Sequence, residues 1–345
     1  MSGLHSPADL AAAGLASPES VAALEAVTAR YAMAITPEIA ALIDPLDPLD
    51  PIRRQFAPDP AELETKPQER ADPIGDAAHS PVEGIVHRYP DRVLLKLLHA
   101  CPVYCRFCFR RETVGPGGAG MLSGEALEQA LAYIRSDPAI WEVILTGGDP
   151  LALSPRRLAQ AMEALAAIPH VKVVRLHSRV PAVDPSRITP EVIAALKRFP
   201  RAVYVALHAN HPRELTPVAR EACARLIDAG IVMVSQTVLL AGVNDDAGVL
   251  ADLMRAFVET RIKPYYLHHP DLAPGTSHLR VSITRGQELV RALLGRVSGL
   301  CQPAYVLDIP GGFGKSPIGP SYLTPSEQGW RVEDYQGGSH DYDDA

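Results

Sequence analysis

Three cysteines close together are the clearest chemical signal in this chain. Cys101, Cys105 and Cys108 follow an apolar run and account for three of the five cysteines. Thiolates at this spacing can bind a cubane iron–sulfur cluster, and three of them leave one iron without a protein ligand. Structural zinc is the alternative, but zinc prefers four ligands in close pairs, and Cys223 and Cys301 are isolated. We therefore predict a 4Fe-4S cluster with one open, reactive iron.

A glycine-rich turn follows a later strand-like run. Gly147, Gly148 and Asp149 leave backbone groups with little side-chain cover, which suits a polar ligand that approaches the main chain. Taken alone, the same residues could equally form an ordinary turn.

Lys315 lies at the end of a second glycine-rich segment, residues 311–314. A phosphate-binding loop is disfavoured because that motif needs four residues between its two glycines, whereas only Gly312 and Phe313 separate Gly311 from Gly314. Pro317 would also stop the helix that must begin at the lysine. A lysine on a flexible arm can enter a cavity, where lost solvation lowers its pKa and favours the neutral amine that reacts with an aldehyde. A solvated surface lysine is the alternative, which the neighbouring Asp308 makes less attractive.

The elements that must position these residues alternate between strand-like and helix-like runs from residue 92 onward. The expected strands cover residues 93–98, 141–146, 171–176, 202–207, 231–239, 264–267 and 304–308. The expected helices cover residues 124–135, 155–167, 190–198, 213–228, 246–259 and 284–298. Such alternation predicts parallel βα units. Because polar residues follow almost every strand, as in βα barrels, we expect a partial, open parallel barrel rather than a doubly wound sheet.

The chain divides into three parts that differ in composition and in predicted secondary structure. Residues 1–85 are expected to form an N-terminal helical extension, with helices near 8–14, 18–32 and 37–43, and an exposed linker after the Asp-Pro repeat at 44–51. The barrel should occupy residues 86–320. Residues 321–345 should form a C-terminal tail, with its acidic part from Glu333 onward mobile.

Charge and hydropathy narrow the class of protein. A net charge of −7 and a pI near 5.9 argue against nucleic-acid binding, which needs a basic face. The N-terminus lacks the pattern of a secretory signal, and no apolar run reaches the ~20 residues of a membrane span. Clustered free thiols fit a reducing compartment. We expect a cytoplasmic protein that acts on a small molecule, without nucleic-acid or membrane partners.

The cysteine spacing, with Phe107 before the last cysteine, resembles the signature of the radical S-adenosylmethionine (SAM) superfamily, whose open iron binds SAM and cleaves it reductively. Further segments resemble, in the same order, the lysine 2,3-aminomutase family, which also uses pyridoxal phosphate (PLP). They are residues 87–92, 101–111, 145–151, 235–244, 264–272 and 308–315. The likeness implies an α/β fold of the radical SAM type with a PLP site.

The resemblance implies a role for each matching residue at the cofactors. The cluster ligands are Cys101, Cys105 and Cys108, and the residues near SAM are Gly147, Gly148, Asp149, His208 and Gln236. The residues at PLP are Lys315, which binds it covalently, and Arg88, Tyr89 and Arg92, which lie near its phosphate.

Three further residues would bind the substrate, with Arg110 at its carboxylate and Asp271 and Asp308 at its distal ammonium. Because a buried ammonium without a partner is costly, two carboxylates select a dibasic amino acid. The implied reaction interconverts L-lysine and β-lysine. Each aspartate could instead be structural, with Asp308 capping the glycine turn and Asp271 starting an exposed loop.

Departures from the family refine the expectation. Larger members bind zinc between subunits through C-terminal cysteines that this chain lacks, and Asp246 replaces the remaining ligand, so zinc is not expected. The short chain, and His268 in place of a tyrosine, look more like the aminomutase that supplies β-lysine for modifying elongation factor P. Free β-lysine for other uses is the alternative role. The resemblance also implies an electron donor such as flavodoxin or ferredoxin and allows a homo-oligomer.

Three competing functions stay open on the sequence. The enzyme could act on another amino acid such as glutamate, or be a radical SAM enzyme without PLP, such as a methylthiotransferase. A non-catalytic iron–sulfur scaffold or sensor is the third, but it leaves Arg110, Asp271 and Lys315 without a role.

Overall fold

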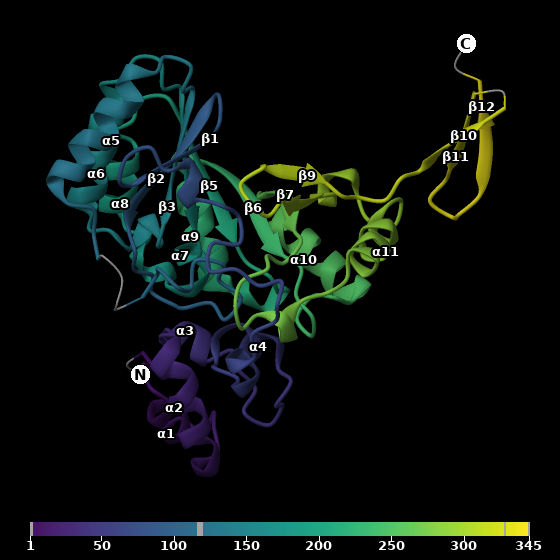
Figure 1. Cartoon of the computed structure of the whole chain (residues 1–345), viewed down its shortest axis with the longest axis horizontal. Coiled ribbons are helices and arrows are strands. Elements are labelled where there is room, and N and C mark those ends of the chain that lie inside the picture. The colour runs from purple at the N-terminus through teal and green to yellow at the C-terminus, as the bar shows by residue number, and fades with distance from the viewer. Residues whose placement is uncertain (1–2, 116–119, 328, 344–345) are drawn as a thin grey trace.

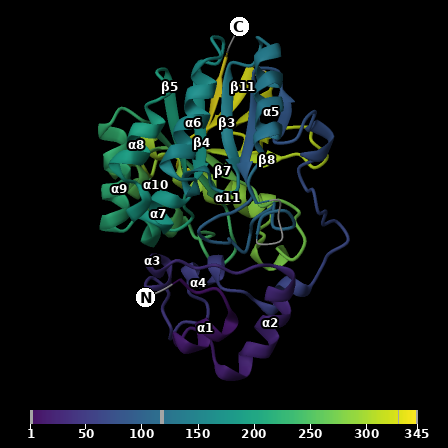
Figure 2. The ribbon, with the colours of Figure 1, turned by 90° about the vertical axis from the view of Figure 1, so that its left-hand side faces the viewer.

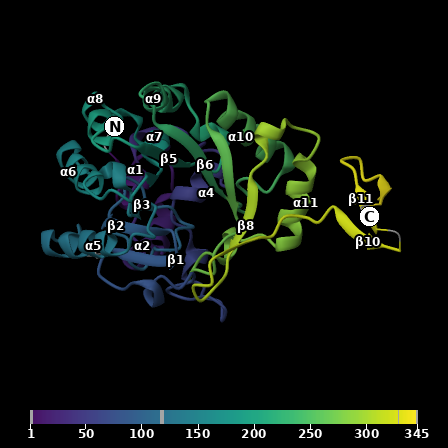
Figure 3. The same cartoon turned by 90° about the horizontal axis from the view of Figure 1, so that it is seen from above.

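The computed structural model describes residues 3–115, 120–327 and 329–343. A nine-stranded sheet in the order β1 to β9 curls into a half-barrel (Figures 1 and 3). Its strands are β1 (Ile85–Tyr89), β2 (Arg92–Leu98), β3 (Glu142–Gly147), β4 (Val173–Ser178), β5 (Ala202–His208), β6 (Val232–Val238), β7 (Lys263–His268), β8 (Ala304–Asp308) and β9 (Lys315–Pro317). The predicted open barrel is confirmed.

The sheet is mixed, whereas the sequence predicted only parallel strands. Strands β2 to β8 are parallel, but β1 and β9 pair antiparallel at the two edges. Both edge strands reverse over short loops, Pro90–Asp91 before β2 and residues 309–314 before β9. Antiparallel neighbours need only a tight loop, while each parallel neighbour needs a crossover.

Helices cover the outer face of the half-barrel (Figure 2). They are α5 (Gly124–Ser136), α6 (Pro155–Ala166), α7 (Val180–Val183), α8 (Pro190–Leu196), α9 (Pro217–Asp228), α10 (Ala247–Glu259) and α11 (Ile283–Leu293). Successive side chains of each strand point to opposite faces of the sheet, one toward the apolar core under the helices and the next toward the cavity. In β3, Val143 and Leu145 belong to the apolar core under the helices, whereas Ile144 and Thr146 line the interior.

Two predicted helices have different ends. The run at 213–228 contains a short 3₁₀ turn and a helix that begins only at Pro217. Thr216 caps that helix by accepting a hydrogen bond from the backbone of Ala219, and proline suits the first helical position. The run at 284–298 ends earlier, because α11 stops at Leu293.

The N-terminal extension packs beneath the barrel (Figure 2). Its helices are α1 (Pro7–Ala12), α2 (Val21–Arg30), α3 (Pro37–Ala40) and α4 (Pro51–Phe56). They share an apolar cluster that includes Leu10, Ile39 and Phe56, and Val103 and Val183 of the barrel part complete it. The segment expected to be an exposed linker after the Asp-Pro repeat is exposed only in part, because buried side chains anchor it to the rest of the protein. These include Asp50, Gln55, Glu62 and Asp76.

The C-terminal residues form a second sheet that stands away from the barrel (Figure 1). Its antiparallel strands are β10 (Leu323–Ser326), β11 (Gly329–Glu333) and β12 (Ser339–Tyr342). An ion pair between Arg291 and Glu333 joins it to α11. Glu333 and residues 339–342 thus belong to a hairpin whose glycine turn favours strand reversal, and the predicted mobility of this segment stays a prediction.

The divisions of the chain at residues 85 and 320 stay predictions, and residues 1–2 and 344–345 of the predicted end segments lie outside the described residues. In the part of the chain that the structure describes, no helix is long and apolar enough to span a bilayer.

Candidate active site

A cavity of about 440 Å³ runs through the half-barrel, a size that suits small ligands. Its lining extends from the cysteine loop at the C-terminal ends of the strands to Trp141 and Glu142 at the other end. Every residue predicted to bind a cofactor or the substrate lines this cavity. They are Arg88, Tyr89, Arg92, Cys101, Cys105, Cys108, Arg110, Gly147, Gly148, Asp149, His208, Gln236, Asp271, Asp308 and Lys315.

The three cysteines lie on the loop that follows β2. Burial raises the pKa of each thiol, that of Cys108 to about 11. Iron binding would therefore have to displace protons from these thiols. Within the described residues, no three His, Cys, Asp or Glu side chains lie in positions that could hold a single metal ion. The donor set fits a cluster in its chemistry, since three thiols share one end of one cavity.

The N-terminal extension contacts the cysteine loop through backbone hydrogen bonds and ion pairs. The backbone amide of Tyr104 donates to Ala34, and that of Arg106 donates to Gln55, at 3.1 and 2.8 Å. The side chains of Arg106 and Arg111 both contact the carboxylate of Glu62, which is fully buried. Burial alone would raise the pKa of Glu62, but the two guanidinium groups outweigh it and lower that pKa. Sequence reasoning missed Glu62 because its partners are more than 40 residues away.

The glycine turn after β3 packs against the chain that enters the cysteine loop. A Cβ atom on Gly148 would lie 2.6 Å from the nitrogen of Ala100, and one on Gly147 would lie 2.6 Å from the oxygen of Leu98. Neither position has room for a side chain. Asp149 is buried, which raises its pKa, and it accepts hydrogen bonds from the backbone amides of Leu151 and Arg179. The turn thus has a packing role in addition to its predicted contact with SAM.

His208 and Gln236 form a buried pair on neighbouring strands. Nε2 of His208 lies 2.7 Å from Oε1 of Gln236. Burial lowers the pKa of His208 to about 3, so the ring is neutral and donates from Nε2. The ring of His177 lies 5.6 Å from that of His208, centroid to centroid.

An acidic group lies at the end of β8. Nζ of Lys315 is 2.6 Å from Oδ1 of Asp308, and Nδ1 of His268 is 3.4 Å from Oδ2. Burial would raise the pKa of Asp308, but the His268 hydrogen bond and the Lys315 charge outweigh it and lower that pKa. Burial and the charge of Asp308 raise the pKa of Asp271 to about 7. Asp271 lines the cavity with its Oδ1 atom buried, so it does not start an exposed loop.

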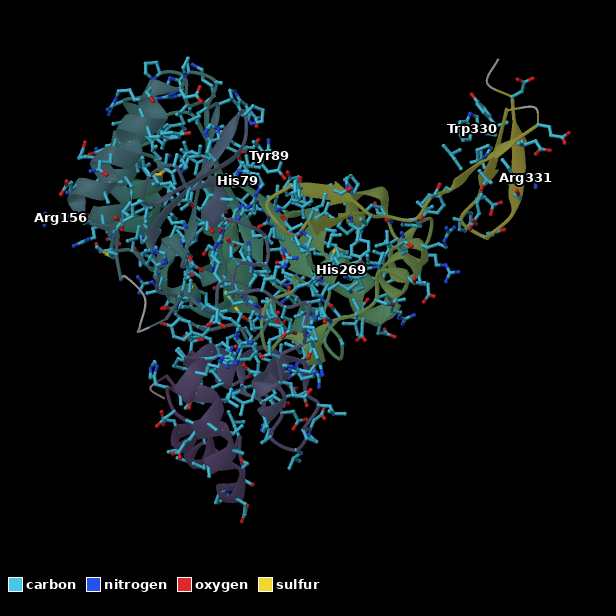
Figure 4. The ribbon with its side chains drawn as sticks, viewed as in Figure 1. His79, Tyr89, Arg156, His269, Trp330 and Arg331 are labelled. Atoms are coloured by element: carbon cyan, nitrogen blue, oxygen red, sulfur yellow. The ribbon has the colours of Figure 1, made fainter. Side chains whose placement is uncertain are left out.

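Three residues predicted at the PLP phosphate lie where the two edges of the sheet meet. The hydroxyl of Tyr89 accepts a 2.6 Å hydrogen bond from the backbone amide of Lys315, so β1 contacts β9 across the opening of the half-barrel (Figure 4). The guanidinium of Arg92 stacks 3.9 Å from the centre of the Tyr89 ring. Arg88 donates to Asp76 at 3.0 Å. Arg88 and Arg92 line the same cavity as Lys315, and cations there suit an anionic group.

Arg110 has a partner that the sequence did not reveal. Its Nε and Nη2 donate to one oxygen of Asp76, at 3.0 and 2.8 Å. Burial would raise the pKa of Asp76, but the charges of Arg110 and Arg88 lower it overall. Asp76 therefore orients both arginines, and it lies in the segment expected to be an exposed linker.

Several buried polar atoms of the cavity wall point to a polar ligand. Among the described residues, Oδ1 of Asp271, Nε2 of His177 and Nε of Arg88 are buried and lack a hydrogen-bond partner. Such atoms are rare in native proteins because each one costs free energy. The amine, the cations and the acidic pair around them fit a cofactor phosphate and an amino acid.

Comparison with known proteins identifies the family. The chain is 43% identical to L-lysine 2,3-aminomutase of Clostridium subterminale over 291 residues, which is 84% of this chain and 70% of the relative. It belongs to the L-lysine 2,3-aminomutase family. The Radical SAM superfamily matches residues 95–254, from within β2 to within α10. This lysine 2,3-aminomutase homologue is thus a radical SAM aminomutase, an isomerase, as the sequence predicted.

Other members differ in length and in name. L-lysine 2,3-aminomutase of Escherichia coli is 36% identical over 272 residues, 79% of each chain. Glutamate 2,3-aminomutase of Clostridioides difficile is 38% identical over 300 residues, 87% of this chain and 70% of that relative. A radical SAM methyltransferase from Sphaerobacter thermophilus matches in structure with a TM-score of 0.43, at 22% identity over 65% of this chain and 68% of that one.

Membership implies a 4Fe-4S cluster and SAM, and the aminomutase relatives imply PLP. The roles assigned to single residues stay predictions.

Proposed function

We propose that this aminomutase interconverts L-lysine and β-lysine with a 4Fe-4S cluster, SAM and PLP. The observation that carries the proposal is the acidic pair of Asp271 and Asp308 in the wall of the cavity, beside the amine of Lys315. Two buried carboxylates that influence each other's pKa favour a ligand with a positive charge. The distal ammonium of lysine supplies that charge.

Each cofactor would have its own part of the cavity. When bound, SAM on the reduced cluster supplies an organic radical, and PLP delocalises the unpaired electron of the substrate. The cysteines would hold the cluster, with Gly148, His208 and Gln236 near SAM. Lys315 would hold PLP covalently. Arg88, Arg92 and Tyr89 would bind its phosphate at the seam between β1 and β9.

The substrate would bind between a cation and the acidic pair. Arg110, which Asp76 orients, would bind the α-carboxylate by charge-assisted hydrogen bonds. Asp271 and Asp308 would bind the distal ammonium and so fix the distance between the two ends of the amino acid.

One anaerobic assay tests the substrate. Protein reconstituted with iron, sulfide and PLP receives labelled lysine, SAM and a reductant, and mass spectrometry with chiral separation identifies the product. We expect β-lysine, and a loss of about 10- to 100-fold in kcat/KM in Asp308→Asn, the size of one charged hydrogen bond. Unchanged lysine together with isomerised glutamate would contradict the proposal.

Glutamate is the second candidate substrate, because one relative carries the name glutamate 2,3-aminomutase. Its distal carboxylate would meet Asp308, whose pKa is lowered, and the like charges would repel. A radical SAM enzyme without PLP is excluded if reconstituted protein shows the visible absorbance of a PLP–lysine adduct that Lys315→Ala lacks.

We further propose that the β-lysine serves to modify elongation factor P, a role that His268 supports because it stands where larger members of the family have a tyrosine. Deleting the gene and measuring the mass of the factor in the cell would test this: loss of the β-lysyl mass is expected, and an unchanged mass would assign the product elsewhere. We expect a cytoplasmic enzyme reduced by a flavodoxin or ferredoxin.

A further inference from the structure

A buried arginine contacts one of the cluster cysteines directly. Nη1 of Arg179 lies 3.2 Å from Sγ of Cys105. Arg179 follows the end of β4, and its side chain is 8% exposed. The contact links the cysteine loop after β2 to a strand two places along the sheet, and neither the motif nor its spacing indicated it.

The remaining contacts of Arg179 hold its guanidinium in place. Nη2 donates to Oε1 of Gln55 at 3.1 Å and to the carboxylate of Glu214. The aromatic rings of Phe56 and Phe107 lie 4.7 and 5.4 Å from its central carbon. With a carboxylate on one side and rings beside it, the group has little freedom to turn away from the thiol.

Glu214 is held as firmly as Arg179. It is fully buried and accepts hydrogen bonds from the backbone amides of Asn210 and His211, at 2.8 and 3.0 Å. Gln55 also donates to it at 3.1 Å, and comes from α4 of the N-terminal extension. Gln55 and Glu214, which are distant from Arg179 in the sequence, thus hold its guanidinium group against Sγ of Cys105.

We propose that Arg179 is a positioning residue for the cluster, which donates a charged hydrogen bond to the Cys105 thiolate and raises the reduction potential of the 4Fe-4S centre. The inference rests on the cluster site proposed above but on neither PLP nor the identity of the substrate. Hydrogen bonds to cluster sulfurs and the charge around them set such potentials.

The direction follows from charge. Reduction adds one electron to the cluster and its thiolates, so a fixed positive charge beside a ligand sulfur stabilises the reduced form more than the oxidised form. Removing that charge makes reduction harder. A charged hydrogen bond of ordinary strength corresponds to a change of about tenfold in the ratio of reduced to oxidised cluster.

The test is a redox titration of the reconstituted cluster, followed by electron paramagnetic resonance without SAM, PLP or lysine. The double variant Arg179→Met/Glu214→Gln removes both buried charges together, since either alone would leave the other unpaired. We expect its ratio of reduced to oxidised cluster at a fixed potential to fall about tenfold, which is about 59 mV for one electron. Arg179→Lys, which keeps the charge, should shift less.

The matched control is Arg175→Met/Glu142→Gln. This second arginine–glutamate pair also lines the cavity, with 2.8 Å between Nε of Arg175 and Oε1 of Glu142, and among the described residues neither side chain is paired with a cysteine. Its variant should keep the potential of the parent protein. An unchanged potential in the Arg179 double variant, or an equal shift in the control, overturns the proposal.

A measurement on the unaltered protein covers the case in which the Arg179 variant fails to fold. Protein grown with ¹⁵N-guanidinium arginine and reduced should show coupling of the electron spin to an arginine nitrogen and its exchangeable protons. Absence of that coupling also overturns the proposal. Either result is independent of whether lysine reacts.

Discussion

The ammonium of Lys315 lies 2.6 Å from Oδ1 of Asp308, so the lysine proposed to hold PLP is ion-paired with a carboxylate proposed to hold the substrate. One Asp308 oxygen thus binds an amine that belongs to the protein. If Lys315 forms the proposed covalent bond to PLP, its ammonium would leave this position and the carboxylate would become available to the distal ammonium of the substrate. Loading of the cofactor and binding of lysine would then be linked through one oxygen atom.

This link predicts that the amine of Lys315 competes with substrate lysine in the protein without PLP. Lys315→Met should bind lysine about tenfold more tightly than the unaltered apoprotein, because one charged contact is no longer exchanged. Isothermal titration calorimetry measures both affinities. Lys315→Arg keeps a cation at the position and is the control. Equal affinities for Lys315→Met and the parent would show that Lys315 does not occupy the substrate position.

A pH dependence of lysine binding is predicted from Asp271. Its pKa is raised to about 7, so the carboxyl is neutral below that pH and gains its charge above it. Only the charged form attracts the ammonium, hence the KM for lysine should rise about tenfold as the pH falls from 8 to 6. Steady-state kinetics across this range checks it.

Asp271→Asn is the control for the pH dependence, since an amide does not titrate. Its KM should be high and nearly constant with pH. A KM that keeps the same pH profile in this variant would place the titrating group elsewhere.

The glycine turn predicts a defect in cluster assembly. In Gly148→Ala the new methyl group would meet the backbone of Ala100, one residue before Cys101, and backbone cannot move aside as a side chain does. We expect the variant to lose about 1–3 kcal/mol of stability and part of its iron. Thermal unfolding and iron content per chain measure these. Gly299→Ala, where a Cβ meets nothing within 4 Å, should change neither.

The N-terminal extension is predicted to be part of the folded core, because Glu62 neutralises two arginines of the cysteine loop. Glu62→Gln leaves Arg106 and Arg111 buried without a counter-charge, and should lower the free energy of unfolding by about 3–5 kcal/mol. Denaturant unfolding of the protein measures it. Glu163→Gln, which breaks only an exposed pair with Arg198, should cost less than about 1 kcal/mol. Similar losses in both variants would contradict the assignment.

The sequence by itself determined the chemistry that local patterns encode. The spacing of Cys101, Cys105 and Cys108, the glycine turn at 147–148 and the alternation of strands and helices are short-range properties. They identified the family and the half-barrel, because each strand of a parallel barrel brings its own C-terminal residues to a common end.

Only the tertiary structure decided which charges meet. Four hydrogen bonds join residues that are 34 to 124 positions apart in the sequence. They link Arg110 to Asp76, Arg106 to Glu62, and Arg179 to both Gln55 and Glu214. The partners of these arginines come largely from a segment that the sequence suggested was a linker, since proline-rich composition shows where helices break but not what the chain packs against. Burial then sets the charge state of each group, and no local pattern encodes burial.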